Sequence, residues 1–332
     1  MLALPSACTS STSSCRRQPV NAPHLPGRVQ RPRPSLHCGS RSTPVAQSSA
    51  SGLVALSGVP ESGDGVPPAT GRNATELPPP SLFDKIRALA FFVWSFALAL
   101  PLFVTMLSMA PFVMALDKYR RLAQHFVNNI WAKVSTSLFY GVEVRGREHL
   151  PPPERPVVYV ANHQSFLDIY SLFHLNRPFK FISKTSNFLI PIVGWSMFLT
   201  GHVMINRVDR RSQLECLKAC GQLLQRGAPV LFFPEGTRSK SRVMAGFKKG
   251  AFSVAVKAGV DIVPVTLLGT GDLMPSGSES VLRPGKVIIT VHPAIPTAGR
   301  DAGKVCKEAR DVIASALPPE LVGLETVMAA DD

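Results

Sequence analysis

The feature that most constrains this chain is a run of 29 residues without a charge, from Ala88 to Leu116. A helix needs roughly 20 apolar residues to span a bilayer, so the run is long enough to do so. Pro101 and Pro111 interrupt it, and basic residues flank both of its ends. Positive charge at both ends favours a bent hairpin that returns to one face of a membrane, with a single tilted span as the alternative. We therefore expect residues 81–120 to form a membrane-associated helical hairpin that anchors the protein.

The segment before this run has the composition of a targeting sequence. Its first 60 residues hold twelve Ser, eight Pro and six Arg, and no acidic residue precedes Glu61. Low hydrophobicity combined with Pro and Ser argues against a packed core. A basic, Ser-rich and acid-poor N-terminus is typical of transit peptides for chloroplasts or mitochondria. Residues 1–80 are therefore predicted to be a disordered transit peptide and linker, and a disordered tail with no targeting role is the alternative.

Residues 121–332 have the pattern of an α/β domain. Short β-rich runs alternate with helical stretches, and most of these runs are continuously apolar, as in a sheet covered on both faces. We expect a mixed central sheet flanked by helices. The expected strands are Val142–Arg145, Val157–Ala161, Phe179–Ile182, Val203–Ile205, Pro229–Phe233, Ile262–Leu268 and Val287–Val291.

Two further segments between these strands carry predictions. Arg210–Arg226 has apolar residues along one stripe and is predicted to be a helix, capped by Ser212 and ended by Gly227. Phe188–Ile205 is apolar but broken by Pro and Gly, which favours a core helix and a strand over a second membrane span. The six cysteines show no CxxC pair and no zinc spacing, so we expect buried thiols and no metal.

The first chemical motif, NHQSFLD at Asn162–Asp168, directly follows the strand Val157–Ala161. Catalytic groups are often held on loops at strand ends. His163 and Asp168 are five residues apart, so they meet only if the histidine lies in a turn and the aspartate in the first helical turn beyond it. Asp168 would then hold Nδ1–H and leave Nε2 as a general base. Alone, the pair is equally compatible with a helix-capping Asp and a structural His.

The second motif, FPEGTRS at Phe233–Ser239, follows another predicted strand. Glycine lets the backbone approach a ligand closely, and the Arg238 guanidinium forks onto phosphate oxygens. Glu235 would repel phosphate, so it is expected to hold a glycerol hydroxyl or to orient Arg238. A β-turn with a solvated arginine is the alternative.

Together these two motifs resemble the glycerolipid acyltransferase family, in particular the plastid 1-acylglycerol-3-phosphate acyltransferases. Two more blocks of that family follow the same order, Gly201–Arg207 and Val263–Val265, and the resemblance extends over about residues 81–318. His202 departs from the pattern, since an apolar or small residue is expected there.

The resemblance implies an enzyme that acylates the sn-2 hydroxyl of lysophosphatidic acid to give phosphatidic acid, without metal or cofactor. It implies that His163 is the base and Asp168 its partner. It assigns acceptor binding to Glu235, Gly236, Thr237, Arg238, Arg207 and Lys184. The location it implies is a plastid membrane, the inner envelope, with a mitochondrial membrane as the alternative.

Charge leaves the acyl donor open. Lys and Arg total 36 against 22 Asp and Glu, a net charge of +14, which favours acidic partners. The resemblance points to acyl carrier protein as donor, and acyl-CoA is the alternative because it too is anionic. Other acceptors, such as glycerol 3-phosphate or another lysophospholipid, remain open, as does a lipid-binding protein without catalysis. Nucleic-acid binding would explain the charge, but the long apolar run and the lack of a nucleic-acid motif argue against it.

Overall fold

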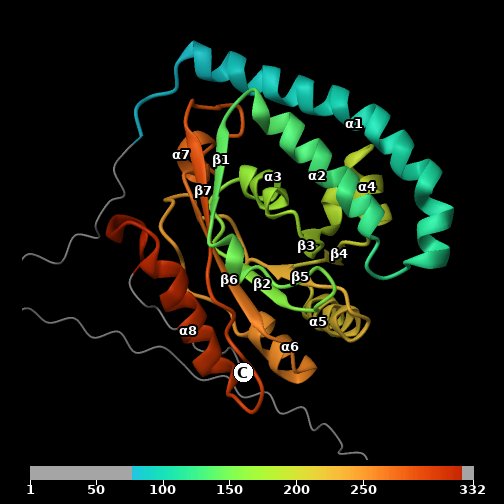
Figure 1. The fold of residues 1–332 in the computed structure, drawn as a ribbon. Helices are drawn as coiled ribbons and strands as arrows, with labels where there is room; N and C mark the ends of the chain where they lie inside the picture. Colours follow the sequence, from blue (N-terminus) through green and yellow to red (C-terminus); the bar gives the residue numbers. More distant parts are fainter. Residues whose placement is uncertain (1–76, 324–332) are drawn as a thin grey trace, which may run out of the picture. The chain divides into compact units, whose positions relative to one another are not determined.

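A single mixed sheet organises the protein (Figure 1). The computed structural model describes residues 77–323, so the predicted transit peptide lies almost wholly outside the described residues. The strands run in the order β1-β7-β6-β2-β5-β3-β4, and every neighbouring pair is parallel except β6–β7, which is antiparallel. The fold class and all seven expected strands are confirmed. The strands are β1 (Gly141–Arg145), β2 (Val158–Ala161), β3 (Lys180–Lys184), β4 (Val203–Ile205), β5 (Val230–Phe232), β6 (Ile262–Leu268) and β7 (Lys286–Val291).

Helices cover both faces of the sheet, which explains the continuously apolar strands. Along β2, Tyr159 and Ala161 face one core cluster, and Val158 and Val160 face the other. The first cluster packs under α1 (Leu82–Leu116), α2 (Leu122–Ser137), α3 (Leu167–Leu172) and α4 (Val193–Thr200). The second packs under α5 (Arg210–Gln225), α6 (Gly250–Ala258) and α8 (Ala302–Ser315). Short elements complete the chain: α7 (Thr270–Leu273) and the 3₁₀ turns η1 (Arg147–His149), η2 (Phe173–Leu175), η3 (Thr185–Leu189) and η4 (Pro319–Leu321).

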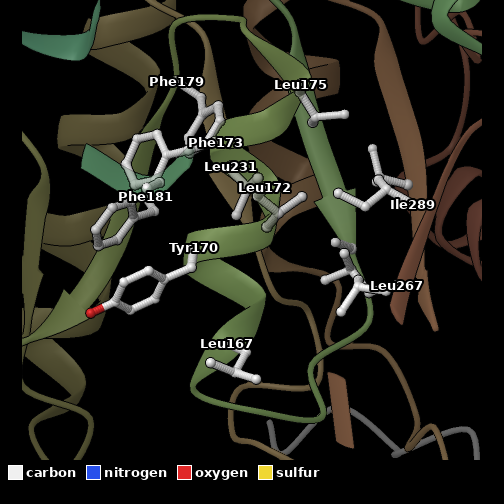
Figure 2. Packing of buried hydrophobic residues seen from close by; sticks show 14 of the residues in the cluster. Leu167, Tyr170, Leu172, Phe173, Leu175, Phe179, Phe181, Leu231, Leu267 and Ile289 are labelled. Atoms are coloured by element: carbon white, nitrogen blue, oxygen red, sulfur yellow. The ribbon is translucent and has the colours of Figure 1, made fainter. Parts of the chain in front are cut away.

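The core below α3 fixes the loop that carries the first motif (Figure 2). Leu167 and Leu172 of α3 are fully buried against the sheet, and Tyr170 lies between them in sequence with its ring beside Phe181 in the view. Phe173 stacks on Phe179, with ring centroids 5.4 Å apart. Such close packing holds the short helix in one position relative to the strand ends.

The apolar run differs from the predicted hairpin, because it forms one continuous helix. α1 contains both Pro101 and Pro111 and bends without reversing (Figure 1), as expected where proline removes a backbone hydrogen bond. A capping box between Ser81 and Asp84 starts the helix. Among the described residues it is the one helix long and apolar enough to cross a membrane, with a mean hydropathy of 2.1 in its most apolar window.

The chain reverses after α1, and α2 returns antiparallel against it. Trp94 Nε1 donates to the carbonyl of Val134, and Trp131 Nε1 donates to the carbonyl of Ser95. The Ser95 hydroxyl in turn lies 3.0 Å from the hydroxyl of Tyr170 in α3. The hairpin therefore consists of α1 and α2, and it is joined by hydrogen bonds to the helix that follows the first motif.

The other two predicted segments are confirmed in outline. The region Phe188–Ile205 forms α4 and β4 as expected, and α5 begins at the predicted residue. The predicted cap of α5 is wrong: Asp209 accepts from the Arg211 N–H, while the Ser212 hydroxyl accepts from the Asn206 N–H. Asp209 directly precedes the helix, and its short carboxylate reaches the first unpaired N–H groups, so it caps α5 in place of Ser212. The described cysteines, Cys216, Cys220 and Cys306, are buried free thiols, as predicted.

Two basic side chains tie the α1–α2 turn to the end of α4. Lys180 Nζ donates to the carbonyls of Arg120 and Thr200, both at 2.6 Å. Arg121 Nη1 donates to the carbonyls of the two residues before Thr200, at 2.7 and 2.8 Å. The last carbonyls of a helix have no partner within it, so these cations satisfy the end of α4.

His202, which departs from the family pattern, lies near Lys180 and has a structural role there. His202 Nδ1 accepts from the Phe181 N–H, and His125 Nε2 accepts from the Phe179 N–H, so the two rings satisfy backbone donors of β3 and of the residue before it. Both must be neutral to accept. Burial, helped by the Lys180 charge, lowers the pKa of His125 to about 3 and that of His202 well below its ordinary value.

Lys180 makes stability depend on pH in a predictable direction. Burial lowers its pKa from 10.5 to about 7, with a further contribution from Arg121. Between these values the unfolded chain binds the extra proton, so raising the pH favours the fold, by at most ~1.4 kcal/mol per unit. The neutral amine keeps two N–H groups, one for each carbonyl. Lys180→Met should therefore lower Tm, and the gap to wild type should widen from pH 7 to pH 9.

Thermal unfolding of the detergent-solubilised protein at both pH values measures this gap. Lys257→Met, at an exposed position of α6, is the matched control and should show a small gap that does not change with pH. A gap for Lys180→Met that stays constant would show that this lysine is charged in the folded protein throughout the range.

Candidate active site

The site begins where β2 ends, and Asn162 fixes that end. Its side-chain amide donates to the Leu267 carbonyl at 2.9 Å and accepts from the Leu267 N–H at 2.8 Å. The amide thus adds one step to the pairing of β2 with β6, which otherwise stops at Ala161. Because Asn162 is fully buried, the loop leaves the sheet from a fixed point.

His163 and Asp168 meet as the spacing requires. The histidine lies in the turn and Asp168 in the first turn of α3, and His163 Nδ1 is 2.7 Å from Asp168 Oδ2. The same oxygen accepts from the N–H groups of Gln164 and Ser165, at 2.8 and 2.9 Å. A carboxylate that collects donors is an acceptor, so Nδ1 carries the proton. Nε2, on the opposite side of the ring, is then the basic nitrogen.

Glu235 of the second motif holds the same loop from the other side. Its carboxylate accepts from the His163 N–H at 2.6 Å and from the Ala245 N–H at 2.9 Å, and the residue is 6% exposed. The Ser239 N–H donates to the His163 carbonyl, which adds a second link between the motifs. Burial raises the pKa of Glu235 to about 7, and the two backbone donors limit that rise. The two motifs are therefore one unit joined through the backbone of His163.

His163 opens onto a cavity of about 680 Å³. Its ring stacks on Phe233, with centroids 3.9 Å apart and planes inclined by 15°, and its side chain is 12% exposed. Most of the wall is apolar. It comes from α1, α2, α3 and α4 and includes Leu102, Phe103, Met106, Trp131, Ile169, Tyr170, Val193 and Met197. A cavity of this kind suits a ligand with a hydrocarbon part.

The polar end of the cavity is basic. Lys184, Arg207, Thr237 and Arg238 line it together with His163, so the structure brings five of the predicted site residues into one cavity. Burial and the neighbouring Arg238 lower the pKa of Arg207 from its ordinary value, but an arginine remains charged at neutral pH. The arrangement offers a general base, a basic pocket for an anion and an apolar wall within one space.

Comparison with known proteins gives this arrangement a family. A family model described as Acyltransferase matches residues 141–268. The chain is 71% identical over 261 residues to a 1-acyl-sn-glycerol-3-phosphate acyltransferase of Chlamydomonas reinhardtii, a match that covers 78% of each chain. The chain belongs to the 1-acyl-sn-glycerol-3-phosphate acyltransferase family.

Two further relatives carry the same acyltransferase description. A chloroplastic 1-acyl-sn-glycerol-3-phosphate acyltransferase of Arabidopsis thaliana is 48% identical over 249 residues, covering 75% of this chain and 69% of that one. The crystal structure of the 1-acyl-sn-glycerophosphate acyltransferase PlsC from Thermotoga maritima matches with a TM-score of 0.59 at 30% identity. That match covers 70% of this chain and 95% of the other.

Two predicted binding residues have different surroundings from those expected. Glu235 contacts backbone N–H groups, and Arg238 pairs with Glu279 at 2.7 Å, so the expectation that Glu235 orients Arg238 is wrong. Gly236 adopts φ of 78°, and its N–H donates to the Phe233 carbonyl within the turn. Glu235 and Gly236 are not among the residues that line the cavity. In the acyltransferase these two residues shape the loop, whereas Arg238 and Thr237 face the cavity.

Three structural roles had no signal in the sequence. Phe233 stacks on His163, Asn162 pairs with Leu267, and Glu279 pairs with Arg238. The first two lie inside the motifs, where a residue's neighbours in space cannot be read from the chain. Glu279 lies in a loop rich in Ser and Gly that resembles any solvated turn.

Glu235→Gln separates loop positioning from substrate binding. Glutamine can accept only one of the two backbone N–H groups well, and its own N–H₂ faces the other donor. We expect kcat to fall about 10- to 100-fold, the order of one charge-assisted hydrogen bond, with KM for the acceptor lipid nearly unchanged.

Steady-state kinetics with the acceptor varied test this expectation. Glu154→Gln, at an exposed position of the β1–β2 loop, is the matched control and should behave as wild type. A large rise in KM with kcat retained would instead place the Glu235 carboxylate on a hydroxyl of the acceptor.

Proposed function

We propose that the protein transfers an acyl group from a thioester to the sn-2 hydroxyl of 1-acylglycerol 3-phosphate, forming phosphatidic acid, with His163 as the general base. Membership of the family supports the reaction. The observation that carries the assignment of the base is the 2.7 Å contact between His163 Nδ1 and Asp168 at the wall of a cavity with a basic end.

The geometry gives each step a group to perform it. His163 Nε2 removes the proton of the acceptor hydroxyl while that oxygen forms a bond to the thioester carbonyl carbon. Asp168 keeps the ring oriented and stabilises the imidazolium that results. When the tetrahedral intermediate collapses, the C–S bond breaks, and the departing sulfur takes the proton from His163 and leaves as the free thiol, which restores the neutral base. The acyl group passes directly between substrates, so the enzyme supplies no nucleophile.

The basic end of the cavity binds the acceptor phosphate in this proposal. Arg238 offers a planar set of N–H donors that matches phosphate oxygens, and Lys184 and Arg207 add positive charge from β3 and the loop after β4. The apolar wall then holds the acyl chains. Phosphate and base lie at the same cavity, so binding the headgroup brings the glycerol hydroxyl to His163.

The helical hairpin is proposed to place this cavity at a membrane. α1 exposes large apolar side chains along its length, including Val104 at 64% and Phe112 at 69%. α2 and the residue that follows it add an exposed apolar side chain at every fourth position: Leu122, Phe126, Ile130, Val134 and Leu138. A soluble surface rarely has so large an apolar area. The chloroplastic relatives and this helix suggest association with a plastid membrane, and we propose the inner envelope.

For the donor we propose acyl carrier protein. The basic surface predicted from the net charge of +14 favours association with an acidic protein. The chloroplastic relatives support a plastid setting, and acyl-CoA is the alternative donor.

Replacing either member of the pair tests the mechanism. His163→Ala should lower kcat at least ~10²-fold because the hydroxyl loses its base. Asp168→Asn should lower it to a similar or greater extent, since an amide in that position favours the wrong ring tautomer. Both variants should bind liposomes as wild type does. Near-normal turnover by His163→Ala would remove the base from the mechanism.

A matrix of substrates tests the reaction and the donor. Protein lacking residues 1–80, in liposomes, is given 1-acylglycerol 3-phosphate or glycerol 3-phosphate, each with acyl carrier protein or CoA thioesters. We expect phosphatidic acid from the lyso acceptor, formed faster from the carrier protein thioester. Acylation of glycerol 3-phosphate alone would assign the same chemistry to a different acceptor, and a preference for CoA would overturn the proposed donor.

A further inference from the structure

One residue of the cavity contradicts its basic character. Among the described residues that line the cavity, Glu279 is the one acidic side chain, and it lies with Lys184, Arg207 and Arg238 at the polar end. A carboxylate repels phosphate, so its presence in a phosphate pocket calls for a physical reason.

Glu279 forms an ion pair with Arg238, the cation proposed to bind the phosphate. Its Oε1 accepts from Arg238 Nη1 at 2.7 Å, and both side chains are 35% exposed. The same oxygen accepts from the Gly277 N–H at 3.2 Å, within the turn of its own loop, where Gly277 adopts φ of 90°. The carboxylate is therefore held on the guanidinium by the exposed tip of a loop, at Gly277 and Ser278, whose ends are buried at Met274 and Leu282.

The carboxyl group is charged at neutral pH. Burial acts to raise its pKa, but backbone N–H groups, including that of Gly277, and the charge of Arg238 outweigh burial and hold the pKa below its ordinary value. An anion thus pairs with Arg238 at the place where the phosphate of the acceptor is expected.

We propose that Glu279 is an exchangeable counter-ion of Arg238, which the phosphate of the acceptor displaces on binding and which returns to Arg238 when the product leaves. The inference rests on the proposed function, because it takes Arg238 as the phosphate ligand. A phosphate carries more charge and more acceptor oxygens than a carboxylate, and Lys184 and Arg207 add to its attraction, so it wins the exchange. An ion pair that is one-third exposed is weak enough to be displaced.

The exchange has a consequence for turnover. Lyso acceptor and phosphatidic acid carry the same phosphate, so competition from Glu279 weakens both to the same degree. The product binds with one more acyl chain in an apolar cavity and would otherwise be held more tightly than the substrate. Competition at the headgroup weakens the binding of the product and so favours its release, and Glu279 takes no part in proton transfer.

Glu279→Gln in the full chain tests the proposal, with Glu154→Gln as the matched control. Glutamine keeps the acceptor oxygen for the Gly277 N–H but removes the charge. We expect KM for 1-acylglycerol 3-phosphate and the inhibition constant of phosphatidic acid both to fall about two- to five-fold, with KM for the thioester unchanged. Glu279→Ala, which also removes the hydrogen bond within the loop, should shift both constants in the same direction, and Arg238→Ala should shift them upward.

Two outcomes would overturn the inference. A higher KM for the acceptor in both Glu279 variants would mean that the carboxylate orients Arg238 for the phosphate. Unchanged constants would mean that the ion pair has no part in binding.

The experiment also separates this inference from the proposed function. If wild type forms no phosphatidic acid, the proposed function fails, yet calorimetric binding of glycerol 3-phosphate to wild type and Glu279→Gln still tests the exchange. Tighter binding by the variant supports it, and equal or weaker binding overturns it.

Discussion

The site depends on one buried oxygen. Asp168 Oδ2 accepts from the His163 ring and from two consecutive backbone N–H groups, so a single carboxylate sets both the ring orientation and the path of the loop. A buried carboxylate without donors would be strongly destabilising. The five-residue spacing works because the loop curls around the oxygen before α3 begins. The three donors to Oδ2 therefore fix the ring orientation and the loop path together.

A second buried carboxylate, that of Glu235, also holds the His163 loop, but it binds the backbone and not the ring. Glu235 holds the backbone of His163 and Ala245 and turns its charge away from the cavity. Neither of the two buried carboxylates lines the cavity, and both accept from N–H groups, whereas Lys184, Arg207 and Arg238 line it. This separation lets the site combine negative groups, which hold the His163 ring and loop, with the basic pocket proposed for the anionic headgroup. Glu279 is the exception, and its partner Arg238 explains why it can be tolerated.

The sheet, its strand positions and the His163–Asp168 contact could be predicted from the sequence, because they depend on local patterns. Apolar runs encode buried strands, and the spacing allowed only one geometry for the pair. The hairpin was misplaced because Pro101 and Pro111 each bend a helix without having to end it, and hydropathy does not distinguish a bend from a reversal. The partners of Glu235 and Glu279 could not be predicted, because each pairs with residues distant in the chain, at positions set by packing of the sheet.

The anchor and the catalytic part are one structural unit. Leu102, Phe103 and Met106 of α1 line the cavity, so the helix that is apolar enough to enter a membrane also forms a wall of the site. Lys180 and Arg121 fasten the turn after α1 to α4, which lines the same cavity. A lipid acceptor whose chains lie in a bilayer would meet apolar surface from the membrane to the base without crossing water. In the proposed function α1 therefore serves both membrane association and the site, so the chain would not be divided in function at residue 120.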